Sequence, residues 1–150
     1  MRSVVDEWLT NHNIDLLHPD VWPYHGINCG VAEAALTSIA LGIAEERPVA
    51  IYGIAGFVLL GAAEVIKLYK PRNSVLIFNA GHNGCYPQNI GIGHQIDYDA
   101  PLSEILGISL DEPCPGKCTR DEMVTNVDRT LGRLIREPGW HLVRLGFDLC

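Results

Sequence analysis

The chain has 150 residues, of which 47% are hydrophobic and 19% charged, and its net charge is −7 at pH 7. This composition is typical of a single folded domain and excludes a disordered chain. An acidic surplus without a basic stripe argues against nucleic-acid binding. Charges occupy residues 1–7, where a secretory signal would need an apolar stretch, so we expect a cytoplasmic protein without a leader peptide.

The cysteines are odd in number and scattered along the chain, at Cys29, Cys85, Cys114, Cys118 and Cys150. This distribution favours a reduced cytosolic protein over a disulfide framework. Cys114 and Cys118 are the only close pair, and a zinc site would require two further ligands at matching spacing. We therefore expect two thiols in a turn, and no metal site.

The first predicted helix covers residues 30–44 and is apolar on nearly every side, so it is expected to be buried all round. The next apolar run, residues 48–66, has almost the length of a membrane helix. Gly53 and Gly56 interrupt it, and its flanks lack the aromatic or basic residues of a membrane anchor. It is therefore interpreted as a buried strand over 49–53 and a buried helix over about 57–69, with no membrane span.

Strands and helices continue to alternate in the second half of the chain. Thr119 is expected to cap a helix that has acidic residues at its start and arginines at its end. The pattern predicts one α/β domain over residues 1–150, with its core at about 19–145 and a doubly wound, mostly parallel sheet with helices on both faces. The predicted elements are a strand over 75–80, a glycine-rich loop over 81–93, a short helix over 101–106, an amphipathic helix over 119–136 and a final strand over 140–145.

Glu33 is the only charged residue between Gly26 and Ala44. Burying a lone carboxyl group is costly, so such a group raises its pKa, finds a partner or contacts a ligand. The alternative is a structural role, in which Glu33 complements the helix dipole behind a cap at Asn28 or Gly30.

The glycine-rich loop carries two histidines, His82 and His94, together with Asn83 and Gln95. Ligands of parallel sheets bind in the loops that leave the carboxyl ends of the strands, which makes these side chains candidate ligand contacts. The glycines lack the spacing of a phosphate-binding or dinucleotide-binding loop. A solvated surface loop is the alternative, and a cysteine nucleophile paired with either histidine is a weaker one.

Three stretches together resemble the pyrimidine-binding domain of the transketolase superfamily, which includes transketolase, deoxyxylulose-phosphate synthase and the β subunit of pyruvate dehydrogenase. They are PDVWPYHGINCGVAEAAL (19–36), RPVAIYGIAGFVLLGAAEVI (47–66) and NAGHNGCYPQNIGIGHQID (79–97), and REPGWHLVRL (136–145) resembles the strand that ends this domain. The resemblance covers about residues 19–145. Each motif alone is modest, but their order and spacing are specific.

The resemblance implies thiamine diphosphate as cofactor. Glu33 matches the glutamate that hydrogen-bonds the pyrimidine ring, favours its imino tautomer and so activates the cofactor. His94 matches a catalytic histidine that faces the substrate. An aromatic ring from the second stretch would stack on the pyrimidine, with Phe57 and Tyr52 as candidates, although the family has more aromatics there. His82, Asn83, Gln95 and His25 are further candidates for substrate contacts.

The sequence contains no Gly-Asp dipeptide, with which the superfamily's diphosphate-binding motif begins. The resemblance therefore implies a partner subunit that supplies the diphosphate-binding domain and its Mg²⁺, in a heterotetramer. Two-carbon ketol or acyl transfer between small molecules such as sugars is the expected reaction. The alternatives are a subunit of a 2-oxo acid decarboxylase or dehydrogenase, and a non-catalytic scaffolding relative.

Overall fold

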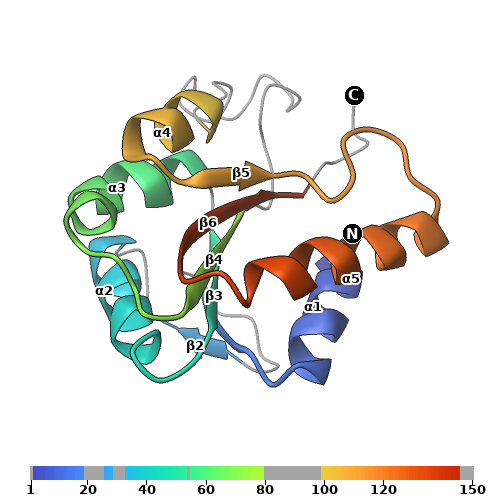
Figure 1. Ribbon diagram of the computed structural model, residues 1–150, viewed down its shortest axis with the longest axis horizontal. Helices are drawn as coiled ribbons and strands as arrows, with labels where there is room; N and C mark the ends of the chain where they lie inside the picture. Colours follow the sequence, from blue (N-terminus) through green and yellow to red (C-terminus); the bar gives the residue numbers. More distant parts are fainter. Residues whose placement is uncertain (1, 19–25, 29–32, 54, 80–98, 146–150) are drawn as a thin grey trace.

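The computed structural model describes residues 2–18, 26–28, 33–53, 55–79 and 99–145, which form an α/β fold (Figure 1). In chain order the elements are α1 Arg2–Asn11, β1 Asp15–His18, β2 Gly26–Asn28, α2 Glu33–Ile43, β3 Val49–Gly53, α3 Ala55–Leu68, β4 Ser74–Asn79, α4 Asp99–Leu106, β5 Ser109–Asp111, α5 Arg120–Leu134 and β6 Gly139–Arg144. The six described strands form one sheet in the order β2-β1-β3-β4-β6-β5, and every neighbouring pair is parallel.

Helices cover both faces of this sheet, because side chains alternate along each strand. Val49 and Ile51 of β3 enter a core shared with α2, α3 and α4. Ala50 and Tyr52 of the same strand enter a second core shared with α1 and α5. In Figure 1 the first group of helices lies to the left of the sheet and the second group to the right. The central strands β3, β4 and β6 are therefore covered on both sides.

The position of α5 follows from the strand order. From β2 to β3, β4 and β5 the chain moves across the sheet in one direction, and the intervening helices α2, α3 and α4 lie on one face. It then returns from β5 to β6 in the opposite direction, and α5 lies on the other face. A right-handed crossover requires this change of face when the direction reverses.

Several elements predicted from the sequence are confirmed. The strand expected over 49–53 is β3, the strand expected over 75–80 is β4, and the last predicted strand is β6. Thr119 is the N-cap of α5: its hydroxyl accepts the Glu122 backbone N–H at 3.3 Å, and the Glu122 carboxylate accepts the Thr119 backbone N–H at 2.8 Å. This capping box fixes the start of the helix at the predicted residue.

The prediction that the first helix, α2, is buried all round is wrong, and α3, predicted as a buried helix, is only partly buried. One side of α2 is buried through Leu36, Ala40 and Ala44, but Ile39 is 42% exposed. On α3, Leu60 is 51% exposed although Ala62 and Ile66 are buried. The two helices pack on the sheet and against each other, and their outer sides are left uncovered by the residues that the structure describes. Nearly uniform apolar composition therefore does not mean burial on every side here.

Helix α1 and the strands β1, β2 and β5 were not predicted from the sequence. Residues Val4, Val5, Trp8 and Leu9 of α1 are buried in the second core, so the core extends before residue 19. Their spacing of one and four residues is a helical signal that was available in the sequence. The three strands have only three or four residues each, too few for a periodic pattern to stand out.

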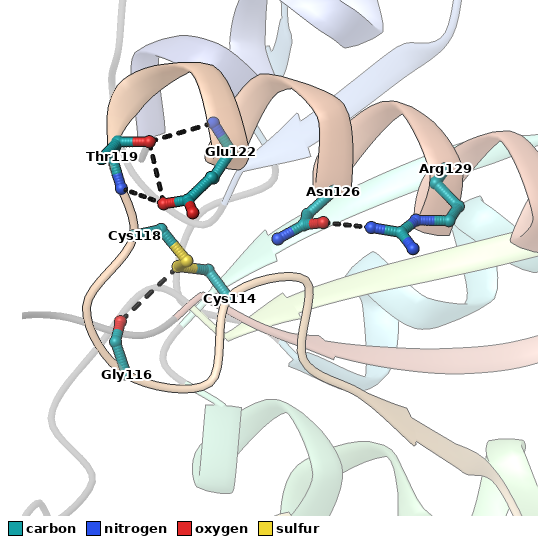
Figure 2. The surroundings of a disulfide bond; sticks show 7 residues. All are labelled: Cys114, Gly116, Cys118, Thr119, Glu122, Asn126 and Arg129. Carbon is teal, nitrogen blue, oxygen red and sulfur yellow. Dashed lines mark hydrogen bonds between the residues drawn. A yellow bond between two sulfur atoms is a disulfide. The ribbon is translucent and has the colours of Figure 1, made fainter.

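The prediction of two free thiols at Cys114 and Cys118 is also wrong, since the two residues form a disulfide (Figure 2). Their Cα atoms are 6.2 Å apart, within the range that a disulfide spans. Gly116 has a φ of +106°, which a residue with a side chain rarely adopts and which turns the chain back on itself. The turn was expected, but the bond depends on a backbone conformation that spacing alone does not define.

Candidate active site

The carboxyl ends of three neighbouring strands lie level with one another. In the strand register Gly53, the last residue of β3, is opposite Asn79, the last residue of β4, and Asn79 is opposite Arg144, the last residue of β6. In parallel sheets this edge is where ligands bind. We therefore take the carboxyl edge of the sheet as the candidate active site.

Glu33 opens α2 at this edge. The opposite end of α2 is tied to the amino edge, because Ala44, just past that end, accepts hydrogen bonds from the backbone N–H and the side-chain amide of Asn73, both at 2.9 Å. Asn73 directly precedes β4. The helix therefore runs antiparallel to the strands, and its first residue lies at the carboxyl edge. The Glu33 side chain lies outside the described residues.

The two aromatic candidates lie on different elements. Phe57 is in the first turn of α3, which begins just after β3 ends, and its side chain is outside the described part of the chain. Tyr52 is only 6% exposed, and its ring centroid is 6.4 Å from that of Phe78. Both rings belong to the core under α1 and α5, whereas α2 and α3 cover the opposite face.

The remaining predicted site residues, His25, His82, Asn83, His94 and Gln95, lie outside the described residues. The residues that flank the segment 80–98 are described. Asn79 ends β4 at the carboxyl edge, and Asp99 begins α4 within hydrogen-bond distance of Arg144. Both flanks of that segment thus lie at the carboxyl edge.

An ionic cluster at this edge was not predicted from the sequence. Arg144 at the end of β6 contacts Asp99 through Nε at 3.2 Å and Glu112 through Nη1 at 2.7 Å. The Asp99 side chain is fully buried and that of Arg144 is 21% exposed. A buried carboxylate requires such a partner, so the contact fixes the start of α4 against the end of β6. The feature of the sequence that could have indicated this cluster is a lone arginine at the end of an apolar strand.

A second set of contacts, next to Glu112 in the chain, joins β5 and α5. Asp111, the neighbour of Glu112, ends β5 and forms an ion pair with Arg133, which also contacts Glu137 at 3.1 Å. These hydrogen bonds and charges raise the pKa of Arg133, with the bond to Glu137 as the largest cause. The set joins α5 to the edge strand.

His141 forms a polar contact outside the candidate site. Its Nε2 is 2.7 Å from the backbone oxygen of Glu137, and its Nδ1 is 2.9 Å from the Ser109 hydroxyl. Because a carbonyl oxygen only accepts, Nε2 carries a proton, and Nδ1 of the neutral ring accepts from Ser109. Both ring nitrogens have hydrogen-bond partners, and the contact with Ser109 holds β5 against β6.

No protein-family model matches the chain, and no curated protein matches it. The fold and the residues of the site therefore carry the functional argument.

Among the described residues, no group of three or more histidine, cysteine, aspartate or glutamate side chains could hold a metal ion. No helix in the described part of the chain is long and apolar enough to cross a membrane.

Proposed function

We propose that this chain is the pyrimidine-binding subunit of a split, transketolase-like thiamine diphosphate enzyme with a doubly wound domain. The observation that supports the proposal most strongly is the position of Glu33. It is the first residue of α2, and that end of the helix lies at the carboxyl edge of an all-parallel sheet. This edge is where a parallel α/β fold binds its ligand, and Glu33 is the residue that the motif resemblance selects as the activating carboxyl group.

The apolar character of the helix that begins at Glu33 supports binding of the pyrimidine end of the cofactor at this end of α2. α2 continues from Glu33 with buried Leu36 and Ala40, so the carboxyl group begins a largely apolar helix. A carboxyl group next to such surroundings can share a proton with a ring nitrogen near neutral pH. When bound, thiamine diphosphate supplies the carbon nucleophile for two-carbon transfer. The chain's own contribution is to orient the ring and hold that proton.

Phe57 is the better of the two candidates for stacking on the pyrimidine. It lies in the first turn of α3, next to the carboxyl end of β3. Tyr52 packs against Phe78 on the other face of the sheet. His94, with His82, Asn83, Gln95 and His25, would face a small sugar or 2-oxo acid, since both flanks of the segment 80–98 lie at the carboxyl edge.

The outer sides of α2 and α3 supply a surface for a partner subunit. Ile39 on α2 and Leu60 on α3 are exposed on helices that pack side by side. Exposed apolar side chains of this kind are typical of a subunit contact. We propose that the partner brings the diphosphate-binding domain and its Mg²⁺ to this side, and that two copies of each chain form a heterotetramer.

The test starts with co-purification of this chain and the product of a neighbouring gene that has a diphosphate-binding motif. Thiamine diphosphate and Mg²⁺ are then titrated by calorimetry into each chain alone and into the mixture. We expect tight binding in the mixture only. Glu33→Gln should assemble normally but lose transfer activity on ketoses and 2-oxo acids, because the amide cannot exchange the proton.

Glu7→Gln is the matched control, since Glu7 is an exposed acid on α1, on the opposite face of the sheet from α2 and α3; it should bind and react like the wild type. Equal activity of the Glu33→Gln and wild-type assemblies would contradict the catalytic role and favour a scaffolding subunit. Substrate preference in the active mixture separates ketol transfer from 2-oxo acid decarboxylation.

A further inference from the structure

The disulfide between Cys114 and Cys118 closes a five-residue loop that leads from β5 into α5. A ring this short constrains few residues of the unfolded chain, so it stabilises the fold less than a disulfide between distant segments does. In a reducing compartment, bonds of this kind persist mainly as redox-sensing or catalytic pairs. The disulfide therefore needs an explanation other than stabilisation of the fold.

The two cysteine residues differ in their exposure to solvent. Cys114 is 1% exposed, whereas Cys118 is partly exposed. A thiolate from solution can attack only a sulfur that it can reach, so attack is directed to Sγ of Cys118 and Cys114 becomes the leaving group. An accessible first sulfur with a buried second sulfur is the arrangement that a reversible thiol–disulfide pair needs.

The loop also accommodates the reduced form. Sγ of Cys114 lies 3.5 Å from the backbone oxygen of Gly116 (Figure 2). In the disulfide this sulfur has no hydrogen, so the contact is not a hydrogen bond in that state. After reduction the Cys114 thiol can donate its S–H to the same oxygen without moving the backbone. The buried sulfur thus has a partner in the dithiol state.

A polar contact of the fold lies next to each end of the loop. Cys118 directly precedes Thr119, whose capping box with Glu122 starts α5 (Figure 2). At the other end, Glu112 lies two residues before Cys114 and forms the 2.7 Å ion pair with Arg144 at the carboxyl edge of the sheet. A change in the loop therefore acts on the first turn of α5 and on the candidate site.

We propose that Cys114 and Cys118 form a reversible redox centre that exchanges electrons with dithiol proteins, and that its reduction loosens the junction between β5 and α5. A thiolate of the dithiol attacks Sγ of Cys118, and the S–S bond breaks to release Cys114 as a thiolate that takes up a proton. The second thiol of the reductant then attacks the mixed disulfide and releases Cys118. The pair gains two electrons and two protons, and the reductant becomes a disulfide.

The first experiment measures access to each sulfur in the native full-length chain. Cys114→Ser leaves Cys118 free, and Cys118→Ser leaves Cys114 free, so the two variants form a matched pair. Both are treated with oxidised glutathione, and the modified residue is located by peptide mass spectrometry, which separates it from Cys29, Cys85 and Cys150. We expect Cys118 to form the mixed disulfide at least roughly tenfold faster than Cys114, because of its exposure. Equal rates would overturn the assigned order of attack.

The second experiment tests reversibility and coupling in the wild-type chain. Dithiothreitol in native buffer should reduce the pair, and oxidised glutathione should restore it, while circular dichroism stays unchanged. Amide hydrogen exchange in the first turn of α5 should be faster in the reduced form, with the last turn of α5 as an internal control. Reduction only in denaturant would identify a structural disulfide and overturn the redox proposal. Reversible reduction without any change in exchange would overturn the coupling. Neither result depends on thiamine diphosphate chemistry.

Discussion

Replacing Arg144 by methionine tests how strongly the carboxyl-edge cluster holds the fold together. Methionine retains an extended side chain but removes the guanidinium group, so the contacts with Asp99 and Glu112 are lost. The two acids differ in burial: the Asp99 side chain is fully buried, and that of Glu112 is 31% exposed. Most of the lost stability should therefore come from Asp99, whose buried carboxyl group loses its contact with the guanidinium group.

The expected loss follows from this difference in burial. Removing one partner of a buried ion pair costs about 3–5 kcal/mol, whereas an exposed pair contributes about 0–1 kcal/mol. Because Arg144 is itself partly exposed, at 21%, we expect the lower end, about 3 kcal/mol in the free energy of unfolding. For a domain of 150 residues this corresponds to a fall in Tm of roughly 6–12 °C.

Urea unfolding, followed by far-ultraviolet circular dichroism, measures this loss. The matched control is Arg47→Met, because Arg47 pairs with Asp15 on the surface, where the two side chains are 59% and 42% exposed. That change should cost less than about 1 kcal/mol. Adding Asp99→Asn to Arg144→Met should recover part of the loss, since a neutral amide is less costly to bury. If Arg144→Met is no less stable than Arg47→Met, the argument from burial is refuted.

Three further predictions concern the start of α5 and the outer side of α2. Thr119→Ala removes the N-cap hydroxyl and should lower the free energy of unfolding by about 1 kcal/mol in the same urea assay; no loss would contradict the cap. The Thr119 backbone N–H, and secondarily its hydroxyl, lower the pKa of Glu122 from the usual 4.5. A lowered folded pKa gives stability that is present above the unfolded pKa and lost as pH falls through the folded value. The wild type should therefore have a larger free energy of unfolding than Glu122→Gln at neutral pH, and this difference should disappear as the pH falls below about 4.5. A difference that increases in acid would contradict the lowered pKa of Glu122. Finally, Ile39→Asp should weaken binding of the proposed partner roughly tenfold or more. Val124→Asp, at an exposed apolar residue of α5 on the opposite face of the sheet, should leave this binding unchanged in calorimetry, and equal effects of the two changes would exclude the α2 surface.

The sequence by itself determined the elements whose signals are local. Several features could be predicted because each depends on residues within a few positions of one another. They are the apolar runs of β3, β4 and β6, the amphipathic pattern of α5 and the capping residue Thr119. The alternation of these elements also indicated an α/β fold with a parallel sheet. Glu33 stood out for the same reason, as a lone charge in an apolar helix.

Only the tertiary structure decided which residues meet across the sheet. Insertion of β6 between β4 and β5 brings Arg144 to Asp99, 45 residues away in sequence, and no local pattern encodes that distance. The exposure of Ile39 depends in the same way on which side of α2 its neighbours cover. The Cys114–Cys118 bond is short-range, yet it depends on the positive φ of Gly116, which spacing does not reveal. Periodicity reports which residues share a face, whereas strand order and burial are set by packing energies summed over the whole chain.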